Sequence, residues 1–92
     1  MSLEKLVSKY ITSTEQVLKE MEILQKPINI DKEEVEEVLK YVEAYFQDAK
    51  YYKEEYKLKV SLTSIAYCEG LLDALKLLGA VKFEWSPKKE KR

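Results

Sequence analysis

Acidic side chains are the residues of this sequence whose types and spacing could do chemistry. Glu69 and Asp73 are four residues apart and would share one face of a helix, and Asp48 precedes them. Such carboxylates can hold a hard cation or act as an acid and base pair. Helical di-metal proteins, however, join Glu residues to Glu-x-x-His motifs, and the sequence contains no His. We therefore favour carboxylates that are solvated or bonded to Tyr and Lys, and predict neither a metal nor a cofactor.

The remaining side chains do not assemble a known type of catalytic centre. Nucleophilic triads normally use His as the base, zinc sites need clusters of His or Cys, and phosphate-binding loops need closely spaced Gly. The sequence has one Cys, Cys68, which has no basic neighbour within a helical turn, and its two Gly are nine residues apart. We interpret Cys68 as a small buried hydrophobic residue and expect a protein that is not an enzyme.

Length and charge limit the organisation of the chain. Its 92 residues suffice for one domain, and 16 basic against 17 acidic residues give a net charge of −1. No run approaches the 18 or so apolar residues of a membrane span, and no secretory signal pattern is present, so we expect a cytoplasmic protein without a membrane partner. Lys88, Lys89, Lys91 and Arg92 make the tail basic. A solvated terminus accounts for this tail; an arm that binds nucleic acid is the alternative.

Apolar spacing predicts an all-α fold. Heptad-like repeats and few Gly or Pro residues indicate helices over about 3–25, 32–57 and 60–79, with Asp31 and Glu34 as a capping box at the start of the second and Gly79 as the terminator of the third. We predict an antiparallel three-helix bundle over 1–80. Residues 81–92 should form an extended segment and a partly disordered basic tail.

The predicted third helix is apolar around more than half of its circumference. A surface helix needs an apolar face of roughly 100°. The excess is explained by a central position in the bundle, by cover from Phe83 and Trp85, or by a second chain. A small-residue stripe that suits close approach of another backbone lies on this helix. The candidate interface residues are Ala66, Gly70, Leu71, Ala74 and Leu78.

Tyr residues near the junction of the second and third helices give a second candidate site. Filling of the bundle edge is the simpler interpretation, and stacking on a planar ligand is the alternative. The candidate ligand-binding residues are Asp48, Tyr51, Tyr67, Glu69 and Asp73.

Two stretches, Asp48-Ala49-Lys50-Tyr51-Tyr52 and Tyr67-Cys68-Glu69-Gly70-Leu71-Leu72-Asp73-Ala74, resemble the archaeal family called domain of unknown function 357, over residues 10 to 80. The resemblance implies a compact helical bundle of unassigned biochemistry. Some relatives appear joined to a nucleotidyltransferase-like domain of the FAD synthase type. The sequence departs from the family pattern at Glu55-Tyr56-Lys57, where relatives tend to carry Gly-Asp.

Two functions follow as expectations. The first is a non-catalytic interaction module, a homodimer or a protein that binds another protein through the third helix. The alternative, which the resemblance suggests, is an accessory domain that binds a nucleotide or flavin-related small molecule and acts with a separate nucleotidyltransferase-like enzyme.

Overall fold

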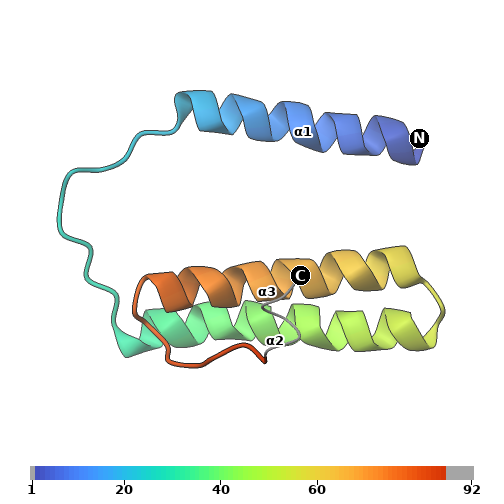
Figure 1. The fold of residues 1–92 in the computed structure, drawn as a ribbon. Helices are drawn as coiled ribbons and strands as arrows, with labels where there is room; N and C mark the ends of the chain where they lie inside the picture. Colours follow the sequence, from blue (N-terminus) through green and yellow to red (C-terminus); the bar gives the residue numbers. More distant parts are fainter. Residues whose placement is uncertain (1, 87–92) are drawn as a thin grey trace.

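Three α-helices make up the regular structure of the chain. The computed structural model describes residues 2–86, in which the helices are α1 (Leu3–Glu20), α2 (Lys32–Glu54) and α3 (Leu58–Leu77), and no strand occurs in this range. Helices α2 and α3 lie side by side and antiparallel, whereas α1 lies apart from them at the end of a long connection (Figure 1). The predicted all-α class with three helices is confirmed.

The start of α2 is fixed by the predicted capping box. The backbone amide of Glu34 donates to Asp31 Oδ1 at 3.0 Å, and the amide of Asp31 donates to Glu34 Oε1 at 3.1 Å. Each side chain thereby satisfies an amide that has no partner within the helix, which stabilises this end by about 1 kcal/mol. The sequence therefore located this boundary to the residue.

Helices α2 and α3 both end in a motif that requires one residue with positive φ. At the end of α3, Gly79 has φ 76°, and the amide of Ala80 donates to the carbonyl of Leu75 at 2.9 Å. The same pattern ends α2, where the amide of Lys57 donates to the carbonyl of Tyr52 at 2.9 Å. Here the left-handed residue is Tyr56, with φ 57°. A side chain in this conformation costs about 1–2 kcal/mol, so the short turn stores strain.

We expect Tyr56→Gly to raise the free energy of unfolding by about 1 kcal/mol, because glycine adopts positive φ without the Cβ clash. Tyr56 is 86% exposed, so the substitution removes little packing. Urea denaturation followed by circular dichroism measures the change. Tyr56→Ala is the matched control, since it removes the same ring and keeps the Cβ. Equal free energies of unfolding for Tyr56→Gly and Tyr56→Ala would contradict backbone strain at this position.

The core lies between α2 and α3 and is small. Its buried residues are Val42, Ala49, Ser64, Cys68 and Leu75. Ser61 Oγ donates to the carbonyl of Ala49 at 2.7 Å and so links the two helices directly. The rings of Tyr45 and Tyr67 stack across the pair with centroids 4.3 Å apart. Tyr56 lies outside this core, as the exposed residue of the turn.

Helix α1 differs from its prediction in both length and packing. It ends at Glu20 rather than near residue 25, and it makes no contact with α2 or α3. Because most helical stability in proteins comes from packing of an apolar face, the unsupported final turn is not retained. The residue before Pro27 also favours extended backbone, and residues 21–31 form an irregular connection. The predicted packing of the first helix into a bundle is therefore not seen.

Candidate functional site

The surface of α3 that points away from α2 is the candidate site. Gly70 lies at its centre, and a Cβ built there would meet no atom within 4 Å. Leu62 is 69% exposed and Leu77 is 89% exposed. We call this surface the outer face of α3 and define it by its exposed residues Leu62, Ala66, Gly70, Ala74 and Leu77.

The structure places the five predicted interface residues in different positions. Ala66, Gly70 and Ala74 lie on the outer face, and Leu78 caps the end of α3 at 65% exposure. Leu71 is half-buried, on the same side of the helix as Cys68 and Leu75. Leu71 thus faces the α2–α3 contact instead of the outer face.

Leu62 and Leu77 belong to the outer face but were not singled out from the sequence. The signal for them was available, because Leu62 precedes Ala66 by four residues and Leu77 follows Ala74 by three. Both leucines are exposed, so the α2–α3 contact does not bury them.

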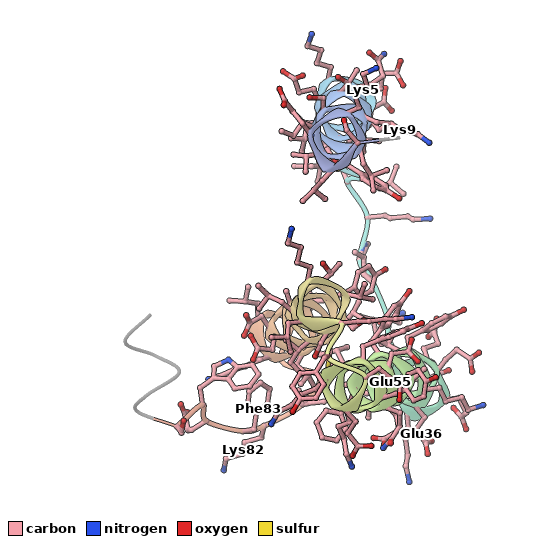
Figure 2. The ribbon with its side chains drawn as sticks, turned by 90° about the vertical axis from the view of Figure 1, so that its right-hand side faces the viewer. Lys5, Lys9, Glu36, Glu55, Lys82 and Phe83 are labelled. Carbon is pink, nitrogen blue, oxygen red and sulfur yellow. The ribbon has the colours of Figure 1, made fainter. Side chains whose placement is uncertain are left out.

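One edge of α3 is covered by the segment that follows it. Trp85 Nε1 donates to Asp73 Oδ1 at 2.7 Å, and Lys76 Nζ lies 3.3 Å from Glu84 Oε2. The ring of Phe83 packs edge-on against Trp85 with centroids 5.0 Å apart. Figure 2 shows Lys82 and Phe83 beside the helix pair. Val81, Phe83 and Trp85 are half-buried while Lys82 and Glu84 are exposed, which is the predicted alternation.

The five predicted ligand-binding residues do not converge on one place. Asp73 is engaged by Trp85, and Tyr67 stacks on Tyr45. At 100° per residue, Tyr67 and Glu69 point roughly 160° apart around α3. On α2, Asp48 is exposed, and Tyr51 packs edge-on against Tyr52 at 5.1 Å. Within residues 2–86 no three acidic or Cys side chains gather as a metal site would require.

Cys68 is the only cysteine and lies in the core. Burial raises the pKa of its thiol above the ordinary value, and the negative charges of Glu69 and Glu43 raise it further. The thiolate is the reactive form of cysteine, so these effects suppress it at neutral pH. The location agrees with the interpretation of Cys68 as a small hydrophobic residue.

A second uncovered apolar surface runs along α1. Its residues fall on one side of the helix at 100° per residue, so they form one stripe down the helix. We call them the α1 stripe, and they are Leu3, Val7, Tyr10, Ile11, Val17, Leu18 and Met21, each exposed. Several of them, with Thr14 and Glu15, line a shallow hollow along this helix. In the predicted three-helix bundle this stripe would face the core.

The connection between α1 and α2 is apolar as well as exposed. Ile23 is 87% exposed, and Leu24, Ile28 and Ile30 are exposed too. Its second half passes the end of α3, where Ile28–Asp31 and Leu78–Ala80 line a common hollow. None of the helices in the described part of the chain combines the length and apolar character that a membrane crossing requires.

Comparison with known proteins identifies a family but no characterised relative. The model of the family described as protein of unknown function (DUF357) matches residues 9–81, which span α2, α3 and most of α1. No curated protein and no solved structure matches the chain. The family match covers well over half of the 92 residues, and the chain therefore belongs to the DUF357 family.

Proposed function

We propose that this protein is a non-catalytic interaction module that self-associates through the outer face of α3. The observation that carries the proposal is the open space at Gly70, where an added Cβ would meet nothing, between the exposed Leu62 and Leu77. Glycine inside a helix costs about 1 kcal/mol relative to alanine. Close approach by a helix of another molecule would use the space that this glycine leaves.

The total surface of the chain supports association. It exposes 8489 Å², whereas a compact monomer of 10.8 kDa exposes about 5,500 Å². Its radius of gyration is 15.9 Å, against about 12 Å for a compact chain of this length. The excess of about 3,000 Å² is several times the roughly 800 Å² that each partner buries in a standard interface.

The chemistry of the described residues is consistent with a non-catalytic role. Cys68 is buried with a suppressed thiolate, and the carboxylate of Asp73 is hydrogen-bonded to Trp85. Neither group offers a free nucleophile or base to a substrate. The exposed feature that distinguishes the α2–α3 pair is the apolar outer face of α3.

Sedimentation equilibrium of Gly70→Leu tests the proposal. A Cβ at this exposed position meets nothing within 4 Å in its own chain, so we expect folding to be retained, while a close contact at Gly70 becomes impossible. We expect twice the chain mass of 10.8 kDa for the natural protein and 10.8 kDa for the variant. Gly70→Ala adds a single methyl and is the graded control, with weaker but detectable association. A monomeric natural protein, or a dimeric Gly70→Leu, would refute the proposal.

A further inference from the structure

We propose that the outer face of α3 is occupied by helix α1 of a second copy of this chain, so that two copies exchange their α1 helices. The inference rests on the proposed self-association and names the segment that fills the interface. It follows from two uncovered surfaces of the same chain, the α1 stripe and the outer face of α3, together with the connection that holds them apart.

The first step is that α3 alone cannot account for the exposed area. The outer face of α3 consists largely of small residues, Ala66, Gly70 and Ala74, which offer little area to bury. The α1 stripe extends over 18 residues of helix and carries the larger aliphatic side chains. An excess of about 3,000 Å² is removed only if the α1 stripe is covered as well. The interface must therefore include α1.

The second step is that the two surfaces have complementary shapes. A helix with small residues at its centre is a groove, and a helix with large aliphatic residues along one stripe supplies the ridge that fits it. Val7, Ile11 and Leu18 can lie over Ala66, Gly70 and Ala74, with Leu62 and Leu77 at the two ends. The residues of the α1 stripe are uncharged, and Glu15, which also lines the hollow along α1, lies at the edge of the stripe.

The third step is that α1 already points its stripe toward the helix pair without reaching it. Figure 2 shows Lys5 on the side of α1 that is farther from α2 and α3 and Lys9 at the flank of this helix, and helical spacing places the α1 stripe opposite Lys5. Helix α1 makes no contact with α3 of its own chain. The chain thus presents α1 in the orientation needed for packing, at a distance that leaves the outer face of α3 open to another molecule.

The fourth step concerns the connection of residues 21–31. Neighbouring antiparallel helices are usually joined by about 2–8 residues, and this connection has eleven, mostly extended. Its second half is held beside the end of α3, so the free part swings α1 away from the pair. Exchange of an element across such a connection is a low-cost route to a dimer of identical chains. Its exposed Ile23 and Leu24 would then lie where the two chains cross.

The experiment compares Val7→Asp with Lys9→Asp by sedimentation equilibrium. Val7 lies in the α1 stripe and Lys9 on the opposite side of the same turn, so the two variants place a new carboxylate in the same turn of α1 but on different faces. In the exchanged dimer Val7→Asp buries two unpaired carboxylates, and we expect the dimer dissociation constant to rise at least about 100-fold. Lys9→Asp should leave it within about threefold. Circular dichroism checks that the helix content of both variants is unchanged.

Mixing two monomeric variants identifies the surface that α1 meets. Val7→Asp has an intact outer face of α3, and Gly70→Leu has an intact α1. In the exchanged dimer the mixture keeps one complete α1–α3 contact, so an equimolar solution should contain a heterodimer that neither variant forms with itself. A mixture that stays monomeric would overturn the exchange.

The other outcomes separate this inference from the proposed function. A dimer that persists in Val7→Asp, with Gly70→Leu monomeric, would overturn the exchange and leave self-association through α3 intact. A monomeric natural protein, with α1 folded onto its own α3, would overturn both the exchange and the proposed self-association.

Discussion

Replacing Leu75 with alanine should lower the free energy of unfolding by about 3 kcal/mol. Leu75 is 5% exposed, and the core that it shares with Val42, Ala49 and Cys68 has no other large aliphatic side chain that is buried. The cavity left by three missing carbons cannot be filled by so few neighbours. Since small domains have total stabilities near the lower end of about 5–15 kcal/mol, this one change removes a large fraction. Urea denaturation at fixed protein concentration measures it.

Leu77→Ala is the matched control for this prediction. It is the same substitution two residues away on the same helix, at a side chain that is 89% exposed. Both changes are best made in a Gly70→Leu background, where the outer face of α3 has no partner. There we expect Leu77→Ala to cost less than about 0.5 kcal/mol. Similar losses in the free energy of unfolding for Leu75→Ala and Leu77→Ala would contradict the position of the core between α2 and α3.

Trp85→Ala should lower the free energy of unfolding by about 2 kcal/mol, because it removes a half-buried ring and a hydrogen bond to a carboxylate. The packing of Phe83 against that ring is lost as well. Trp85→Phe keeps an aromatic ring without the N–H donor, and we expect a loss of about 1 kcal/mol. The difference between the two variants separates packing from hydrogen bonding.

Fluorescence gives an independent measure of the same contact, since the sequence contains a single Trp. Asp73→Ala removes the acceptor of the indole N–H and should shift Trp85 emission to longer wavelength as the ring becomes hydrated. Lys82→Ala removes an exposed charge of the same segment and is the control. Unchanged emission in Asp73→Ala would contradict the docking of residues 81–85 on α3.

The sequence predicted those features of the fold that are governed by local interactions. The Asp31 capping box and the Gly79 terminator are decided within a few residues, and both are confirmed. The all-α class with three helices and the family assignment are confirmed as well. The turn between α2 and α3 was placed only approximately, because Tyr56 occupies a conformation that sequence reasoning reserves for glycine.

Features that depend on tertiary contacts were predicted less well. The periodicity of α1 shows that one face must be covered, but a periodic stripe is the same whether its partner is in the same chain or in another. Leu71 and Leu77 are equally apolar, and only the packing angle between α2 and α3 decides that the first is half-buried and the second exposed. For the candidate site, the sequence indicated the small-residue stripe, which the structure leaves exposed on α3, but not the leucines that flank it. The Trp85 to Asp73 bond joins residues twelve apart, beyond the reach of helical spacing rules.

The isolation of α1 has a consequence for the order of events during synthesis. Ribosomes release α1 first. In the exchanged dimer α1 packs on α3, so a nascent chain would carry an unprotected amphipathic segment for some fifty further residues. The α2–α3 hairpin, with its three-residue turn, requires only local contacts and should form rapidly once complete. Covering of α1 would then be the last and slowest event. Because two finished hairpins must meet, this step is second-order in chain concentration and is slowest at low expression.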